Sequence, residues 1–242
     1  MTKLSTKIVS RVKFLVSNSL TNYFSTNPIY VFHHIPKCGG SSFVYALREW
    51  FSVVKDYKTT HLSKTVSKRK NIEKFRSFQC LSGHFHIPGI YLHERYPEIL
   101  SENRYQVFTI LRDPLEVKIS LYYYQRKVKS KIQPRNISLE QHLLEEPNWM
   151  AARFPCTHDN YQEVLSRYFF IGLLEYPQES IDRLAQLIGK KRIILPVENE
   201  SKRDAQPINI TPELVQKFKE LNDLDYLIYE YCYQRFVKVS PS

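Results

Sequence analysis

The chain has 242 residues, of which 43% are hydrophobic and 14% aromatic, so it is long and apolar enough for one α/β domain and is not a disordered chain. Its formal net charge of +11 suits a polyanionic cofactor, an anionic acceptor molecule, or both. Nucleic acid is the other usual partner of such a charge, but we expect none, because the sequence contains no zinc-finger spacing and no RNP-type motif.

The cysteines are far apart and form no C-x-x-C pair; they are Cys38, Cys80, Cys156 and Cys232. This spacing argues against a zinc site and against a dense disulfide framework, although one disulfide remains compatible with it. We therefore expect a reducing compartment.

Residues 1–27 contain no acid and combine basic residues with an apolar stripe at helical spacing. The basic residues are Lys3, Lys7, Arg11 and Lys13, and the stripe is Ile8, Val12, Leu15, Val16 and Leu20. We interpret the segment as a basic helical extension packed on a single domain formed by residues 28–242. Weak contact with a membrane surface is the alternative, since one short basic helix binds membranes only weakly. No apolar run reaches the roughly 18 residues that a transmembrane helix needs.

The stretch Ile29–Trp50 predicts a strand, a turn and a helix. Ile29–Ile35 is short and rich in β-branched and aromatic residues, as a buried strand is. Pro36–Ser42 (Pro-Lys-Cys-Gly-Gly-Ser-Ser) predicts the turn, and Phe43–Trp50 has the apolar spacing of a helix. Glycines let backbone N–H groups approach an anion, and a helix N-terminus adds partial positive charge. The stretch therefore predicts a phosphate-binding loop with Lys37 in it.

The following segment, Val53–Arg76, is polar and strongly basic, with Lys55, Lys58, Lys64, Lys68, Arg69, Lys70, Lys74 and Arg76 against Asp56 and Glu73. A solvated face and part of a groove for an acidic acceptor are both open interpretations. The short apolar run Phe78–Leu81 then predicts a strand that leads into Ser82, Gly83 and His84. Because open α/β sheets bind ligands at the carboxyl ends of their strands, His84 is expected at such a site.

Tyr105–Leu111 is the clearest strand pattern, apolar and β-branched throughout, and predicts a central parallel strand. It leads into Arg112, Asp113 and Pro114, where Asp113 suits a helix N-cap and Pro114 the first helical position. Arg112 at a strand end can grip a phosphate through two parallel bonds, and Ser120 lies about two helical turns along the predicted helix.

The rest of the chain alternates helices and extended segments. Ser138 with Gln141 predicts a capped helix, Asn148–Phe154 and Asn160–Tyr168 look helical, and Phe169–Leu174 predicts another buried strand. Further predictions are a helix over Glu179–Ile188, an extended piece over Ile193–Val197, a polar loop over Glu198–Pro207, a helix capped by Thr211, and a last helix over Leu221–Phe236. This alternation indicates a doubly wound parallel sheet.

The two motifs together resemble those of sulfotransferases. Pro-Lys-Cys-Gly-Gly-Ser-Ser is not a Walker A motif, in which the lysine follows the last glycine, but it resembles the 5′-phosphosulfate loop of the carbohydrate (type 2, heparan- and chondroitin-like) branch. Leu-Arg-Asp-Pro followed by Ser120 resembles the 3′-phosphate-binding segment, and Ser-Gly-His-Phe resembles the family's Gly-His segment. The resemblance covers about residues 28–237. Two departures are Val117, where a second arginine is common, and Asn148 followed by Ala152 and then Arg153, where Asn-x-x-x-Arg is common.

The resemblance implies a P-loop-like three-layer sandwich, with a central parallel sheet flanked by helices. It implies 3′-phosphoadenosine 5′-phosphosulfate (PAPS) as co-substrate and requires no metal. The residues it assigns to PAPS are Lys37, Cys38, Gly39, Gly40, Ser41, Ser42, Arg112 and Ser120, with Lys202 and Arg203 of the later polar loop. Lys37 would also stabilise the leaving group, and His84 would be the base, with His86 second. We interpret His33 and His34 as structural, and Cys38 as a filler in the loop although a helix N-terminus can lower a thiol pKa.

The expected reaction is sulfonate transfer to a hydroxyl, on a carbohydrate and most suitably an anionic glycan, although a tyrosine in an acidic peptide also suits the charge. We expect a bacterial cytoplasmic enzyme, with a lumenal Golgi domain lacking its anchor as the alternative. Two other functions stay open: a P-loop kinase-like phosphotransferase, and a non-catalytic nucleotide or polyanion binder. The oligomeric state is not indicated by the sequence.

Overall fold

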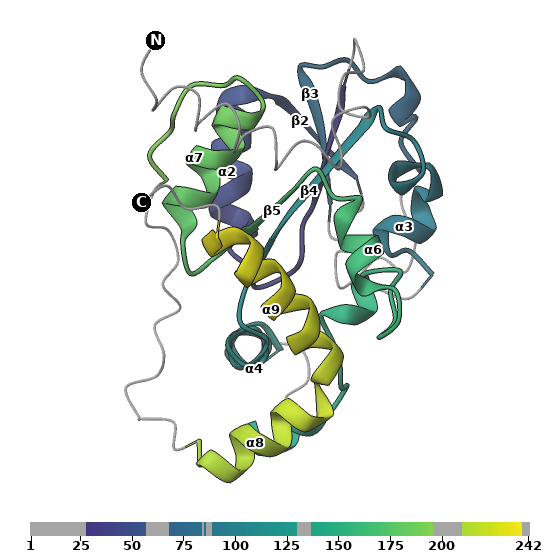
Figure 1. The fold of residues 1–242 in the computed structure, drawn as a ribbon. Coiled ribbons are helices and arrows are strands. Elements are labelled where there is room, and N and C mark those ends of the chain that lie inside the picture. The colour runs from purple at the N-terminus through teal and green to yellow at the C-terminus, as the bar shows by residue number, and fades with distance from the viewer. Residues whose placement is uncertain are drawn as a thin grey trace, which may run out of the picture.

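The computed structural model describes residues 28–56, 68–83, 85, 89–129, 137–195 and 210–238. These residues form a five-stranded sheet in the order β2-β3-β1-β4-β5, in which every neighbouring pair is parallel (Figure 1). The strands are β1 (Ile29–His33), β2 (Ser52–Asp56), β3 (Gln79–Gly83), β4 (Tyr105–Leu111) and β5 (Phe170–Leu173). The predicted α/β class with a central parallel sheet is confirmed.

Helices lie on both faces of the sheet, which gives three layers (Figure 1). Helices α2 (Gly40–Trp50) and α7 (Pro177–Leu187) cover one face, and α3 (Leu92–Arg95) and α6 (Tyr161–Ser166) lie on the other. The remaining helices are α4 (Pro114–Lys129), α5 (Leu139–Leu144), α8 (Pro212–Leu221) and α9 (Asp223–Lys238), with short 3-10 helices at Ile72–Lys74, Pro97–Leu100 and Ala151–Arg153. None of the helices in the described ranges is long and apolar enough to cross a membrane.

The two central strands explain why the apolar patterns of the sequence are continuous. Every residue of β1 and of β4 is buried, because helices cover both faces of the sheet. Successive side chains of β1 alternate between the layers: Tyr30 packs on Phe51 at the end of α2, and His33 packs on Phe154 and Tyr168 near α6. The predicted strand over Tyr105–Leu111 has the same bounds in the structure.

Local capping signals in the sequence also predicted helix starts correctly. The Asp113 carboxylate accepts a hydrogen bond from the Glu116 backbone N–H at 3.0 Å. Ser138 and Gln141 form the predicted capping box, and the Thr211 hydroxyl accepts a hydrogen bond from the Leu214 N–H. Each cap satisfies a backbone donor that the first helical turn leaves without an intrahelical partner.

One predicted helix is wrong, and the structure adds detail to two other segments. The basic segment Val53–Arg76 overlaps an edge strand, β2, which pairs with β3 in parallel register. Asn148–Phe154 is not an α-helix, since only Ala151–Arg153 is helical and that piece is 3-10; Asn148 itself has a φ of 54°. The two helices predicted at the end of the chain are both present and meet at Asn222: α8 ends at Leu221, and α9 begins at Asp223, two residues after the predicted start.

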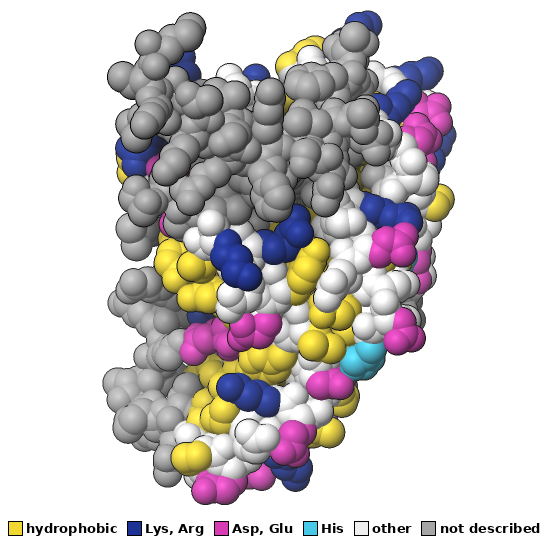
Figure 2. Space-filling model, viewed as in Figure 1, with side chains coloured by type: hydrophobic (Ala, Val, Ile, Leu, Met, Phe, Trp, Pro, Cys, Tyr) yellow, Lys and Arg dark blue, Asp and Glu magenta, His cyan; other side chains and the backbone are white. Residues whose placement is uncertain are grey.

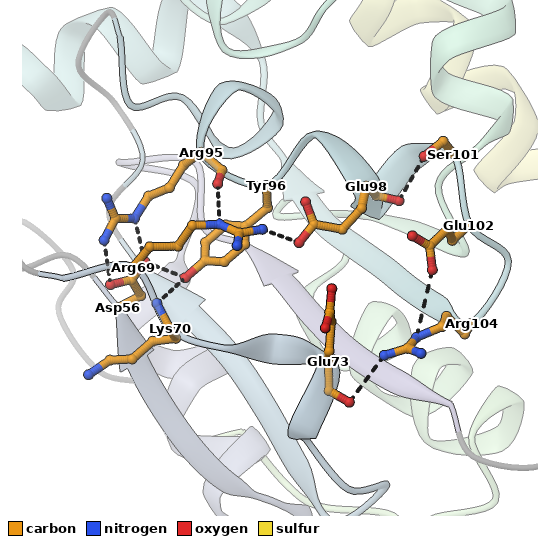
Figure 3. A network of polar contacts seen from close by, with 10 residues as sticks. All are labelled: Asp56, Arg69, Lys70, Glu73, Arg95, Tyr96, Glu98, Ser101, Glu102 and Arg104. Atoms are coloured by element: carbon orange, nitrogen blue, oxygen red, sulfur yellow. Dashed lines mark hydrogen bonds and ion pairs between the residues drawn. The ribbon is translucent and has the colours of Figure 1, made fainter.

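A buried ion pair fixes the carboxyl end of β2 to α3 (Figure 3). Arg95 donates from Nε and Nη2 to the two carboxylate oxygens of Asp56, at 2.5 and 3.1 Å, and the Tyr96 hydroxyl donates to the same carboxylate at 2.6 Å. The Asp56 side chain is fully buried and that of Arg95 is 8% exposed. The Lys70 backbone N–H donates to the Tyr96 hydroxyl, and the Arg69 guanidinium lies 4.7 Å from the centre of the Tyr96 ring. The start of the described 68–83 segment is thereby attached to the same end of β2.

Replacing Asp56 with asparagine should lower the free energy of unfolding by about 3–5 kcal/mol, because the buried Arg95 charge loses its carboxylate partner. Urea unfolding measures the change. The matched control is Glu102→Gln, which removes an exposed ion pair with Arg104 at 3.9 Å and should cost less than about 1 kcal/mol. Equal losses in the two variants would contradict the role of the buried pair.

Candidate active site

The strand order brings the carboxyl ends of β3, β1 and β4 together. His33, the last residue of β1, pairs with Gly83 at the end of β3 on one side and with Thr109 of β4 on the other. The Thr109 hydroxyl also donates a hydrogen bond to the His33 carbonyl at 2.7 Å. The phosphate-loop segment after β1 and Arg112 after β4 therefore start at neighbouring points of one sheet edge. Of the predicted residues, His84, His86, Lys202 and Arg203 lie outside the described residues.

The loop before α2 depends on glycine for two separate reasons. Gly39 has a φ of 73°, in the left-handed region, and a Cβ there would lie 2.4 Å from Leu174 Cδ1. Gly40 begins α2, and a Cβ on it would lie 1.8 Å from His34 Nε2. The loop therefore packs directly on the ends of β1 and β5, with no room for a side chain at either position.

The start of α2 has the properties of an anion site. No side chain caps its first turn, and that turn contains no acid. The N–H groups of Gly40, Ser41 and Ser42 belong to this turn, where donors lack intrahelical acceptors and the helix dipole is positive. These groups can bind a phosphate or sulfate oxygen without displacing a capping carboxylate.

Cys38 does not have the accessible, low-pKa thiol that a helix start can produce. Its side chain is 1% exposed, and burial raises the pKa of the thiol to about 12. Desolvation of the thiolate thus outweighs the helix N-terminus and the nearby Arg112 charge. Cys38 is a core residue, and only its backbone can contribute to the loop. All four cysteines lie in the described ranges, and all are free thiols.

A row of residues at a spacing of four runs from Arg112, two residues before α4, along the helix through Glu116, Ser120 and Tyr124. Arg112 Nη2 contacts a Glu116 carboxylate oxygen at 2.8 Å, and Nη1 lies 3.5 Å from the Lys37 carbonyl oxygen. At the other end of the row, Lys37 Nζ lies 4.5 Å from the centre of the Tyr124 ring. Ser120 lies one helical turn from Glu116 and one from Tyr124 along this row. The structure therefore brings Lys37 and Arg112 together, with Ser120 on the helix that follows Arg112.

Lys37 combines an unusual backbone conformation with a partly buried charge. Its φ is 68°, a left-handed value that is strained for a residue other than glycine. Burial lowers the pKa of its amine, and the neighbouring Arg112 charge lowers it further. Two cations close together in a half-buried position favour a bound anion.

At the two departures from the sulfotransferase motifs, Val117 and Arg153 are buried, whereas Ala152 is exposed. Val117 is buried, and Lys118 is 2% exposed with its amine donating to the Glu145 carbonyl at 2.6 Å, so it does not replace the missing arginine beside the loop. Arg153 is also buried; it donates to the Trp149 carbonyl, and its guanidinium lies 3.3 Å from the centre of the Trp149 ring. Burial lowers the pKa of Arg153 to about 10.

His33 and His34 point to opposite layers, as expected for structural residues. His33 Nδ1 lies 2.9 Å from the Tyr168 hydroxyl, whereas the His34 ring stacks on Phe32 with a centroid distance of 5.6 Å. Burial lowers the pKa of His33 to about 3, so this ring is neutral near pH 7. Within the described ranges, no group of three or more His, Cys, Asp or Glu residues is arranged to hold a metal ion.

Two residues of the site were not singled out in the sequence: Glu116 and Tyr124. The signal for them was present, since they lie four and twelve residues after Arg112, on the helix that Asp113 and Pro114 predict. What the sequence lacks is the direction in which this row faces, which depends on how α4 packs beside the loop.

No protein-family model and no curated protein matches the chain. Among solved structures, it is similar to a sulfotransferase from Alicyclobacillus acidocaldarius, with a TM-score of 0.51 at 15% sequence identity over 85% of this chain and 96% of that one. It is also similar to mouse sulfotransferase SULT7A1 complexed with PAP, with a TM-score of 0.48 at 13% identity over 86% and 90% of the two chains. The similarity to the bacterial protein shows that this chain has the P-loop-like fold of a sulfotransferase; at this identity it shows the fold alone.

The buried His33 should make folding stability depend on pH. Its pKa of about 3 in the folded protein lies below the roughly 6.5 of an unfolded histidine, so between these values the unfolded chain binds more protons. The free energy of unfolding should therefore fall as the pH falls from 6.5 towards 4, with a slope of up to about 1.4 kcal/mol per pH unit from this residue. Urea unfolding across this range should give a correspondingly smaller slope for His33→Asn.

Asp225 contributes the opposite slope, because burial raises the pKa of its carboxyl to about 6. This contribution is present in both proteins and cancels in the comparison. Equal slopes for the wild type and His33→Asn would mean that His33 takes up a proton in the folded protein, which would contradict its neutral state.

Proposed function

We propose that this chain is a sulfotransferase that moves a sulfonate group from PAPS to an acceptor hydroxyl. One observation supports it most: two anion-binding groups, the loop before α2 and Arg112, meet at the adjacent ends of β1 and β4, where Arg112 Nη1 lies 3.5 Å from the Lys37 carbonyl. A donor with phosphates at both its 5′ and 3′ positions needs two such groups. ATP has no 3′-phosphate and would leave Arg112 without a role.

The residues divide between the two phosphates. The N–H groups of Gly39–Ser42, the two serine hydroxyls and Lys37 would bind the 5′-phosphate, and Arg112 and Ser120 would bind the 3′-phosphate. Lys202 and Arg203 remain proposed contributors from the later polar loop. Cys38 would take part through its backbone only, since its side chain is buried.

The reaction would be an in-line displacement at sulfur. The acceptor oxygen forms a bond to sulfur while the bond from sulfur to the bridging phosphate oxygen breaks, and the hydroxyl proton goes to a base. Lys37 and the helix N-terminus would stabilise the charge that develops on the leaving phosphate. We propose His84 as the base because it follows Gly83, whose pairing with His33 makes it a neighbour of the loop strand. His86 is the second candidate.

A carbohydrate hydroxyl, with an anionic glycan as its carrier, is the acceptor class that we propose. In the described part of the basic segment Arg69 has an acidic partner, and so do two arginines that lie beyond the segment, Arg95 and Arg104. Arg69 contacts Glu98, Arg95 binds Asp56, and Arg104 lies 3.9 Å from Glu102 (Figure 3). Figure 2 likewise shows both charge signs interspersed over the described part of one face. The acceptor class therefore depends on the motif resemblance, whereas the proposed cytoplasmic location depends on the cysteine spacing, which suits a reducing compartment.

A thermal-shift and unfolding assay with nucleotides tests the donor. Adenosine 3′,5′-bisphosphate at about 100 times its Kd should raise the free energy of unfolding by about 2.7 kcal/mol, whereas ATP with magnesium should raise it less. Arg112→Ala should reduce the bisphosphate effect to that of adenosine 5′-monophosphate. The matched control is Arg167→Ala, which removes an exposed arginine from a comparable pair with Glu163 and should leave the bisphosphate effect unchanged. Stabilisation by ATP with magnesium but not by the bisphosphate would overturn the proposal and favour a kinase-like function.

Transfer of labelled sulfonate from PAPS to a panel of glycans, lipids and peptides tests catalysis. His84→Ala should lower the transfer rate by about 100-fold or more while bisphosphate binding is retained, because only the proton acceptor is lost. His86→Ala is the control and should retain most of the rate. If the effects were reversed, the base would be His86; bisphosphate binding with no transfer to any acceptor would favour a non-catalytic binder.

A further inference from the structure

Lys37 combines a strained backbone with a flexible side chain, and neither property by itself fixes the position of its ammonium. Its backbone has a strained, left-handed φ of 68°, and its amine is attached through a flexible four-carbon stem. A flexible cation contributes little to the binding of one particular phosphate oxygen unless something holds it. The question is which part of the molecule fixes the ammonium.

The Tyr124 ring provides such a contact. Lys37 Nζ lies over the ring, 4.5 Å from its centre, which is within the distance at which an aromatic face attracts a cation. Tyr124 is 48% exposed, so its ring is not there to fill the core. The contact uses the face of the ring and therefore does not require the phenolic hydroxyl.

Both ends of Lys37 are contacted, one by the residue two positions before α4 and one by a residue of α4. Arg112, at the beginning of the row, contacts the Lys37 carbonyl, and Tyr124, twelve residues later, lies under the ammonium. Ser120 is one helical turn before Tyr124 on this face. Lys37 is thereby held between Arg112 at its carbonyl and Tyr124 at its ammonium.

We propose that Tyr124 is a positioning residue, whose ring face holds the Lys37 ammonium beside the Arg112–Ser120 row. The use of this arrangement for a 5′-phosphate rests on the proposed function. The positioning of Lys37 by Tyr124 does not rest on the proposed function, because it follows from the contact between the two side chains.

The test compares Tyr124→Leu, which keeps an apolar side chain but removes the ring, with Tyr124→Phe, which keeps the ring and removes the hydroxyl. Tyr45→Leu is the matched control, since Tyr45 on α2 is similarly exposed, at 43%. The first measurement is the rate at which an amine-acylating reagent modifies Lys37 near pH 8, followed by peptide mass spectrometry of the full chain.

Loss of the ring should raise the rate of Lys37 modification about 3- to 30-fold, because the ring covers the amine and favours its charged, unreactive form. Burial already lowers the Lys37 pKa, so loss of an attraction for the ammonium lowers it further. Tyr124→Phe and Tyr45→Leu should retain the wild-type rate. Equal rates in all four proteins would overturn the inference, and so would an increase in Tyr124→Phe equal to that in Tyr124→Leu.

The second measurement is the Kd of adenosine 3′,5′-bisphosphate by calorimetry. Tyr124→Leu should weaken binding about 3- to 30-fold, Tyr124→Phe should not, and Tyr124→Leu added to Lys37→Ala should cause no further loss. If Tyr124→Leu weakened binding equally with and without Lys37, the ring would not act through the lysine, and the positioning role would be overturned. If the wild type bound no bisphosphate, the proposed function would fail, and the modification rates alone would decide whether Tyr124 holds Lys37.

Discussion

Strand β1 lies between β3 and β4, and both of its pairings are parallel. This arrangement is the constraint on which the candidate site depends, because parallel neighbours end at the same edge of a sheet. The end of β3 at Gly83, the loop after His33 and Arg112 after Leu111 therefore lie at one edge of the sheet. An antiparallel partner on either side would send one of these segments to the opposite edge. The helices contribute to this arrangement by covering the two faces of the sheet.

The same sheet also holds the loop in its strained conformation. The close approach of Gly39 to Leu174 and of Gly40 to the His34 ring leaves the backbone little freedom, and the left-handed Lys37 lies just before these two contacts. Strain of this kind persists only where the surroundings fix the chain on several sides. Here the loop is fixed by His34 just after β1, by Leu174 just after β5, and by Arg112 just before α4. The backbone donors of α2 are thus arranged before an anion arrives, which reduces the entropy lost on binding.

The sequence predicted those parts of the structure that local chemistry decides. The strand Tyr105–Leu111 was predictable because burial on both faces gives a continuous apolar run. The helix caps at Asp113, Ser138 and Thr211 were predictable because each depends on a side-chain hydrogen bond within the first helical turn. Strand β2 was missed because it is an edge strand with exposed Ser52 and Lys55, and its one charged anchor, Asp56, is buried by a partner 39 residues away. Likewise, no local pattern indicates that Lys118 is buried, since the Glu145 carbonyl that accepts its hydrogen bond is 27 residues away.

Glu116 places a carboxylate beside Arg112, the arginine assigned to a phosphate, so the carboxylate and the phosphate compete for the same guanidinium. The pair is partly solvated, with side-chain exposures of 22% for Arg112 and 36% for Glu116, and ion pairs of this kind contribute little net stability. Its main effect is therefore on orientation: Glu116 holds the guanidinium beside α4, with Nη1 towards the loop, at a small free-energy cost. A phosphate with two negative charges and a bidentate geometry competes well against one carboxylate for such an arginine. Under the proposed function, the ion pair thus keeps Arg112 in place without preventing it from binding the donor.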